Sequence, residues 1–297
     1  VYLSLSQVVI NIFIFYKPFI FLTARKSSTM KTGIIGLGKM GGALLRGMLK
    51  AGAVSPEEVW VYDHHHENVQ ALQQEYPGVH EAATEADAAD AVEALILAVK
   101  PHGVLSLISS LSERGEELPL LISIAAAISL DDMEACASDG TRIVRAMPNT
   151  PCMVLAGVIA YSTGAAVTDE DEEAARRLLS GCGSVYKVEE ARMNAVSAIS
   201  GSGPAYMFTV LDALSDAGVA MGLPRKTALE MAVETMRGSA LMLEQTGKHP
   251  MALRDEVTSP GGTTIAALNA LDECGFRNAW IQAVKSAVRR AEEMEEH

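Results

Sequence analysis

The chain has 297 residues, a formal net charge of −13 and a hydrophobic share of 49%. This length fits one large domain or two ordinary ones, and the apolar share is ample for a sizeable core. The negative charge argues against nucleic acid and anionic membrane surfaces as partners. The four cysteines form no C-x-x-C pair and lie beside no histidine at metal-ligand spacing. They therefore argue against a metal site or a disulfide framework and favour a cytoplasmic protein.

The first 29 residues differ in composition from the rest of the chain. They contain no Asp or Glu, although the chain has 37, and they hold six of its fifteen aromatic residues. A membrane anchor needs about 20 continuous apolar residues, and Gln7, Asn11 and Lys17 interrupt this run. A signal peptide needs a basic start, which is missing. Met30 opens directly into the first predicted strand, so we expect residues 1–29 to be a non-native or disordered extension.

Three glycines lie between a predicted strand, 32–35, and a predicted helix, 43–51. Gly36, Gly38 and Gly41 have the spacing G-x-G-x-x-G, which in this context predicts a dinucleotide site. Gly36 permits the tight turn, Gly38 lets a pyrophosphate approach the backbone, and Gly41 lets helix and strand pack closely. The N–H groups at the start of the helix favour a diphosphate. The alternative is a tight turn with chance glycines.

Apolar runs alternate with helices as far as residue 191, the predicted end of the dinucleotide-binding domain (30–191). The further predicted strands are 59–62, 94–99, 120–124, 143–147 and 158–161, and the further predicted helices are 67–76, 104–111 and one from residue 130. This alternation predicts an α/β fold, a Rossmann-type doubly wound parallel sheet covered on both faces. In such a sheet ligands bind beyond the carboxyl ends of the strands.

The residues that follow the strands are therefore candidate cofactor contacts, with ordinary turn chemistry as the alternative. Asp63 lies about 20 residues beyond the glycines, where a carboxylate accepts a hydrogen bond from a ribose 2′-OH. The predicted cofactor-binding residues are Ile35, Gly36, Leu37, Gly38, Lys39, Met40, Gly41, Asp63, Ala98, Val99, Lys100, Ala125 and Asn149.

Helical patterns alone follow from residue 192. The predicted helices are 204–221, 224–246, 250–257, 263–273 and 276–296, which together predict an all-α domain over 192–297. The helix 204–221 is apolar on most faces, so we expect it to be buried against a second subunit. A central core helix is the alternative.

A glycine-rich loop, 259–264, precedes the helix 263–273. Gly261 and Gly262 expose backbone N–H groups at a helix N-terminus, which makes a small anion site sized for a carboxylate. Thr263 and Thr264 add hydroxyls that can donate or accept hydrogen bonds. The alternative is a helix cap, because threonine is a good N-cap residue.

Four stretches, 98–101, 145–151, 199–206 and 255–264, together resemble those of the delta-1-pyrroline-5-carboxylate reductases. The resemblance runs from Met30 almost to the end, over some 268 residues. It implies a Rossmann domain followed by an all-helical dimerisation and substrate-binding domain. It implies an oxidoreductase that reduces a cyclic imine to L-proline with NADPH or NADH, the last step of proline biosynthesis. It also implies homodimers, often assembled into a ring of five.

The resemblance implies roles for the residues of the glycine-rich loop. Thr264 is the implied catalytic residue, with its hydroxyl on the ring nitrogen. The implied substrate-binding residues are Val257, Ser259, Gly261, Gly262 and Thr263. Family members often carry a small polar residue at Asp63, which suits a 2′-phosphate, whereas a carboxylate repels one. The histidines after Asp63 offset this repulsion if protonated, so NADPH and NADH both stay open. We assign no role to Glu256, the other departure.

Two other functions compete with this one. A beta-hydroxyacid dehydrogenase shares the layout of a Rossmann domain followed by helices, but it uses a lysine on the helix that opens the second domain. No lysine lies between Asn194 and Asp212. A non-catalytic nucleotide sensor would have no reason to retain an intact Ser-Pro-Gly-Gly-Thr-Thr loop.

Overall fold

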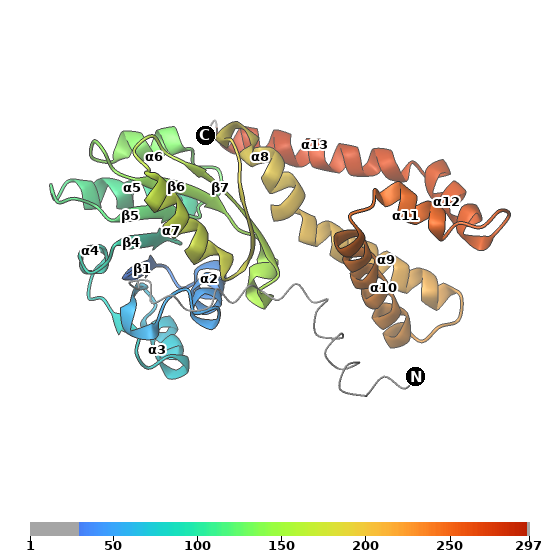
Figure 1. The fold of residues 1–297 in the computed structure, drawn as a ribbon, viewed down its shortest axis with the longest axis horizontal. Helices are drawn as coiled ribbons and strands as arrows, with labels where there is room; N and C mark the ends of the chain where they lie inside the picture. Colours follow the sequence, from blue (N-terminus) through green and yellow to red (C-terminus); the bar gives the residue numbers. More distant parts are fainter. Residues whose placement is uncertain (1–29, 296–297) are drawn as a thin grey trace, which may run out of the picture.

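An eight-stranded sheet flanked by helices is followed along the chain by a group of helices (Figure 1). The computed structural model describes residues 30–295, so the extension predicted for residues 1–29 lies outside the described part. The strand order is β3-β2-β1-β4-β5-β6-β7-β8. The bounds are β1 Thr32–Ile35, β2 Val59–Tyr62, β3 His80–Glu81, β4 Ala94–Leu97, β5 Leu120–Ser123, β6 Ile143–Met147, β7 Gly157–Thr163 and β8 Gly183–Lys187.

Continuous apolar runs mark the strands at the centre of the sheet. Every residue of β1, β4 and β5 is buried, as expected for strands covered on both faces. The six predicted strands are confirmed, three of them with the same bounds. The predicted parallel sheet is confirmed for β1 to β6, whereas β7 runs antiparallel to β6 and β8 runs parallel to β7. The connection between β6 and β7 holds only a short turn, η2 (Thr150–Val154), and parallel strands need a crossover of a dozen or more residues.

Six helices cover the two faces of the sheet. They are α2 Lys39–Lys50, α3 His66–Glu75, α4 Glu85–Asp90, α5 Pro101–Ser112, α6 Leu130–Cys136 and α7 Asp169–Ser180. Successive strand residues point to opposite faces. Ile34 accordingly packs in one cluster with Leu44 of α2 and Leu178 of α7. Ile35 packs in the other with Ile108 of α5, so the sheet is the middle layer of three.

The described chain is helical from Met193 onward, a part that we call the helical half. It comprises α8 Met193–Val196, a π-helical turn η4 Ser197–Gly201, α9 Gly203–Ala220, α10 Arg225–Thr246, α11 Pro250–Glu256, α12 Thr263–Glu273 and α13 Phe276–Glu295. The five predicted helices are confirmed, and the last residue predicted for α13 lies outside the described part. Among the described residues, none of the helices is both long enough and apolar enough to cross a membrane.

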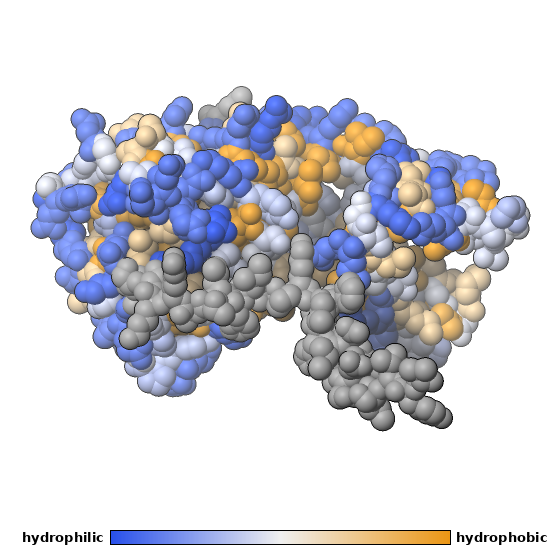
Figure 2. Space-filling view, in the orientation of Figure 1, coloured by the Kyte–Doolittle hydropathy of each residue, from blue (hydrophilic) through white to orange (hydrophobic). Residues whose placement is uncertain are grey.

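Several large apolar side chains on these helices are exposed to solvent when one chain is considered alone. Phe208 is 65% exposed and Leu214 is 50% exposed on α9, and Met231 of α10 and Ile281 of α13 are also exposed. Figure 2 shows apolar residues at the surface of this half of the molecule. Exposed apolar groups on this scale are typical of a surface that a partner covers, as predicted for the helix 204–221.

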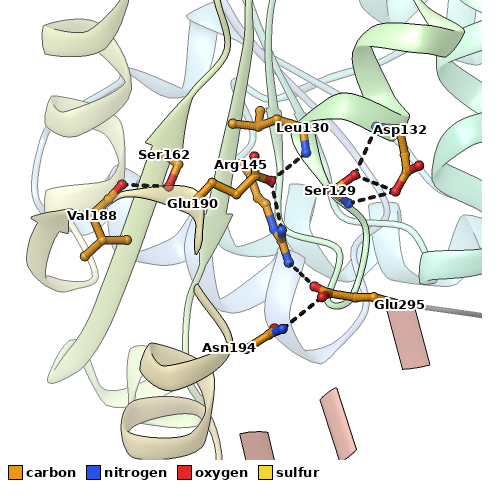
Figure 3. Close-up of polar contacts among 9 residues, drawn as sticks. All are labelled: Ser129, Leu130, Asp132, Arg145, Ser162, Val188, Glu190, Asn194 and Glu295. Carbon is orange, nitrogen blue, oxygen red and sulfur yellow. Dashed lines mark hydrogen bonds and ion pairs between the residues drawn. The ribbon is translucent and has the colours of Figure 1, made fainter. Parts of the chain in front are cut away.

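The register of the last strands decides where the chain leaves the sheet. Arg145 of β6 pairs with Ser123, the last residue of β5, and on its other side with Ser162 of β7. The Ser162 hydroxyl donates to the carbonyl of Val188, just after β8, at 2.8 Å (Figure 3). The chain therefore leaves the sheet level with the carboxyl end of β5, so the helical half begins beside the edge where ligands are expected.

Candidate active site

The glycine turn between β1 and α2 is held by close backbone packing. Gly36 has a φ of +99°, and its N–H donates to the carbonyl of Tyr62 at 2.8 Å. A Cβ on Gly36 would lie 2.6 Å from the carbonyl oxygen of Ala98. A Cβ on Gly41 would lie 2.8 Å from the Ala98 Cβ and would overlap the Gly36 carbonyl. The roles predicted for Gly36 and Gly41 are therefore confirmed, since each lets β1, β4 and α2 approach.

Gly38 differs from the other two glycines of the motif, because a Cβ there would meet nothing within 4 Å. It is the N-cap of α2, no side chain caps the helix, and the first turn contains no acidic residue. The first N–H groups of α2 therefore have no partner within the helix. A hollow of about 600 Å³ adjoins the turn and is lined in part by Gly38, Lys39 and Asn68. Open space, free amides and basic side chains fit a dinucleotide diphosphate.

Asp63 lies at the glycine turn, as the spacing predicts. Its Oδ2 accepts from the N–H of Leu37 at 2.5 Å, and its Oδ1 accepts from the N–H of His65 at 2.7 Å. These bonds fix the carboxylate beside the turn, in position to accept a hydrogen bond from a ribose hydroxyl of a dinucleotide. His66 Nδ1 lies 2.5 Å from Glu81 Oε1.

The other two histidines also face carboxylates. His64 lies 3.7 Å from Glu85, and His65 lies 3.8 Å from Glu67. These glutamates weaken the positive field that the histidines would offer to a 2′-phosphate.

The remaining predicted cofactor contacts follow neighbouring strands. Ala98 donates its N–H to the carbonyl of Ile35 at 2.8 Å, which joins the ends of β4 and β1. Lys100 is exposed and is the N-cap of α5, and Ala125 is buried after β5. Asn149 uses both ends of its side chain in hydrogen bonds inside the protein. Its contact with a cofactor stays a prediction.

The Asn149 side chain joins the sheet to the start of the helical half. Its Nδ2 donates to the carbonyl of Ser200 in η4 at 2.9 Å, and its Oδ1 accepts from the N–H of Val158 at 2.9 Å. A π-helical turn such as η4 is frequent at functional sites. Here it lies directly beside the end of β6.

The loop 259–264, which we call the substrate loop, differs from its prediction at one point. Thr263 and Thr264 lie inside α12, as predicted, and Gly262 is its N-cap with no side-chain cap, so the helix-cap alternative is wrong. Within residues 30–295 neither threonine hydroxyl has a hydrogen-bond partner. The Gly262 N–H, predicted to be free, donates to the Ser259 carbonyl at 3.1 Å. The first amides of α12 remain without an intrahelical partner.

The substrate loop does not meet the glycine turn of its own chain. Figure 1 places α11 and α12 at the opposite end of the molecule from β1 and α2. Between them runs α13, whose 20 residues span about 30 Å. One chain therefore holds the two halves of the predicted site far apart.

Arg145 is a residue whose role the sequence reasoning missed. Its side chain is 5% exposed, yet it belongs to an otherwise apolar strand. Its Nη1 donates to Glu190 at 2.9 Å and its Nη2 to Glu295 at 3.2 Å (Figure 3). A charged residue inside a buried strand needs such partners. The arginine in an otherwise apolar run is therefore the sequence signal that could have indicated the network.

Comparisons with known proteins cover nearly the whole described chain. Residues 190–294 match the family model for pyrroline-5-carboxylate reductase dimerisation, and residues 31–127 match one described as NADP oxidoreductase, coenzyme F420-dependent. A pyrroline-5-carboxylate reductase of Methanosarcina acetivorans is 40% identical over 89% of this chain and 97% of its own length. One of Escherichia coli is 37% identical over 89% and 98%.

Solved structures agree with these matches. A pyrroline-5-carboxylate reductase from Coxiella burnetii has a TM-score of 0.85 at 32% identity, covering 90% of this chain and 98% of that one. One from Plasmodium falciparum, solved with NADP bound, has a TM-score of 0.80 at 29% identity, with the same coverage. The motifs, the fold and the extent of these matches show that the chain belongs to the pyrroline-5-carboxylate reductase family and is an NAD(P)H-dependent oxidoreductase.

Proposed function

We propose that the protein reduces L-delta-1-pyrroline-5-carboxylate to L-proline with NAD(P)H, the last step of proline biosynthesis. The observation that carries this proposal is the substrate loop, which joins a helix N-terminus to two unbonded threonine hydroxyls. The proposal assigns the dinucleotide to residues 30–191 and the substrate and subunit contacts to residues 192–297. The free cysteines support a cytoplasmic location.

The substrate loop offers complementary partners for a cyclic imine that carries a carboxylate. The amides of the first turn of α12, with that of Gly261, would hold the carboxylate at the positive end of the helix. Gly261 has a φ of +67°, a left-handed conformation that favours glycine. The hydroxyl of Thr264 would hydrogen-bond the ring nitrogen and stabilise its proton. Reduced nicotinamide supplies the hydride, so the protein mainly has to orient the two reactants.

The separation of the two half-sites supports a site shared between subunits. In its own chain the loop is separated from the sheet by α13, whose 20 residues alone span about 30 Å (Figure 1). The match to a dimerisation model and the uncovered apolar face of α9 indicate a homo-oligomer. We infer a homodimer in which the loop of one protomer faces the glycine turn of its partner. The ring of five dimers stays a prediction from the resemblance.

Subunit mixing tests this sharing. Thr264→Ala should slow turnover and Gly38→Ala should weaken cofactor binding, so at limiting cofactor each variant alone should have low activity. After subunit exchange, a heterodimer with a shared site would combine one intact loop with one intact turn, and activity should return. A mixture that stays inactive after verified exchange would place both half-sites in one chain.

The substrate assignment is tested by pyrroline-dependent oxidation of NADPH and NADH. Thr264→Ala should lower kcat about ten- to a hundredfold, because one hydrogen bond to a charged group is worth roughly 1–3 kcal/mol. Thr258→Ala is the matched control, since its hydroxyl already donates to the Arg254 carbonyl at 2.6 Å. An inactive parent protein would refute the function, and full turnover in Thr264→Ala would refute the role of the hydroxyl.

A further inference from the structure

Arg145 connects segments that lie far apart in the sequence. It extends from β6 in the sheet to Glu190 in the turn η3 (Glu190–Arg192) and to Glu295 in the last turn of α13. The side chain is almost completely buried, whereas both carboxylates are partly exposed, at 29% and 30%. A single guanidinium therefore ties the end of α13 to the sheet that carries the glycine turn.

The two carboxylates have further partners of their own. Glu190 Oε1 also accepts from the N–H of Leu130, at the start of α6, at 2.6 Å. Glu295 Oε2 accepts from Asn194 Nδ2, on α8, at 2.8 Å (Figure 3). Such a connected network rigidifies the elements that it joins. Losing one partner of a buried ion pair leaves a charge uncompensated, which is why the network resists opening.

α13 extends from this network to the region of the substrate loop. Its C-terminal end is held at Arg145, and its N-terminal end adjoins α12, which follows the loop (Figure 1). Over about 30 Å, a tilt of about 4° at one end moves the other end by about 2 Å. A misplacement of about 1 Å at a reacting centre can cost a hundredfold in rate.

We propose that Arg145 and Glu295 form a clasp that sets the angle of α13 and so positions the substrate loop against the cofactor site of the partner subunit. Both are positioning residues, because neither belongs to the glycine turn or the substrate loop. The packing of α13 against α8 and η4 holds the helix in place, and the clasp fixes its direction. This inference rests on the proposed function.

Arginine has the geometry that the clasp needs. Its planar fork points separate N–H groups at two carboxylates, whereas the ammonium of lysine is a compact point charge on a flexible stem. Arg145→Lys keeps the positive charge but should lose one of the two bonds. Glu295→Ala removes one carboxylate from a partly exposed position, so its effect on folding should be the smaller of the two.

The test combines kinetics with a distance measurement. Glu295→Ala and Arg145→Lys should each lower kcat about tenfold or more while the KM for the dinucleotide stays within twofold. Glu293→Ala is the matched control, because among residues 30–295 Glu293 pairs with Arg290 on the same helix alone, and it should keep the parent kcat. Gel filtration should show the dimer in every variant.

Spin labels report the angle of α13 without reference to activity. Cys136, at the end of α6, is partly exposed, and Cys274, just before α13, is exposed. Cys152 and Cys182 are buried, and burial raises the pKa of the Cys182 thiol to about 12, so neither should be labelled. With labelled protein diluted into unlabelled protein, the distance distribution between Cys136 and Cys274 should broaden in Glu295→Ala and stay narrow in Glu293→Ala.

The outcomes separate this inference from the proposed function. An unbroadened distribution in Glu295→Ala overturns the clasp, whatever the kinetics show. A kcat that stays within twofold of the parent value overturns its part in catalysis, and so does a fall that comes with loss of the dimer. Should the parent protein fail to reduce the pyrroline, the label distances would still decide whether the clasp exists.

Discussion

Gly38 and Gly41 allow one substitution, glycine to alanine, to separate ligand binding from folding. Gly38 has a φ of −60° and a ψ of −172°, which is extended backbone that alanine also adopts. A methyl group there meets open space, and the gain of about 0.4–1 kcal/mol from a less flexible unfolded chain offsets the cost of alanine at an N-cap, so stability should change little. The same methyl group occupies the path of the diphosphate. We expect the Kd for NADPH to rise at least tenfold, or about 1.4 kcal/mol.

Gly41→Ala should show the opposite pattern. Its methyl group meets the Gly36 carbonyl and the Ala98 Cβ, and such overpacking costs about 1–3 kcal/mol. The gain in helix propensity of about 1 kcal/mol offsets part of this cost. Because the overlap is with backbone rather than with a flexible side chain, the cost should lie at the upper end, so the net loss should be about 2 kcal/mol, which lowers Tm by about 4–8 °C in a chain of this size.

Calorimetric titration with NADPH and denaturant unfolding measure the two effects. The expected result is weak binding with full stability for Gly38→Ala and lower stability for Gly41→Ala. If Gly38→Ala binds NADPH within twofold of the parent, the diphosphate does not pass over this residue. If Gly41→Ala is as stable as the parent, the close approach of α2 to β4 does not constrain the turn.

Two further predictions concern the cofactor and the subunit contact. Asp63→Ser should raise the ratio of kcat/KM for NADPH to that for NADH about tenfold, because it removes a negative charge that faces a 2′-phosphate; an unchanged ratio would show that Asp63 does not select the cofactor. Leu214→Asp should give monomers in sedimentation experiments, since a charge on the exposed apolar face of α9 would have to be desolvated at a subunit contact. A dimer that persists at low micromolar concentration would place the contact elsewhere.

The central strands could be predicted because burial on both faces requires continuous apolar sequence, as in β4 and β5. β8 could not, since Ser184 and Tyr186 are exposed on an edge strand and break the pattern. α7 was missed, although its acidic first turn and the capping box of Thr168 and Asp171 are both sequence signals for a helix start. The reversal of β7 depends on the length of one connection rather than on composition.

At the candidate site, too, local features could be predicted from the sequence and long-range contacts could not. The glycine turn is local, so the spacing of Gly36, Gly38 and Gly41 already contains its geometry. The substrate loop is also local, but the Gly262 amide is used inside it, a detail that needs coordinates. The contact of Arg145 with Glu295 joins residues 150 positions apart. No periodicity or spacing indicates such a pair.

The two edge strands of the sheet affect whether copies of the chain can aggregate by strand pairing. An exposed strand edge presents unpaired N–H and C=O groups that can recruit another chain into a growing sheet. One edge, β3, is only two residues long, which limits such pairing. The other, β8, ends in Lys187, whose charge is held by an ion pair with Glu172. Short length and an edge lysine both discourage sheet-to-sheet aggregation, so subunits can recognise each other through their helices without competition from the strands.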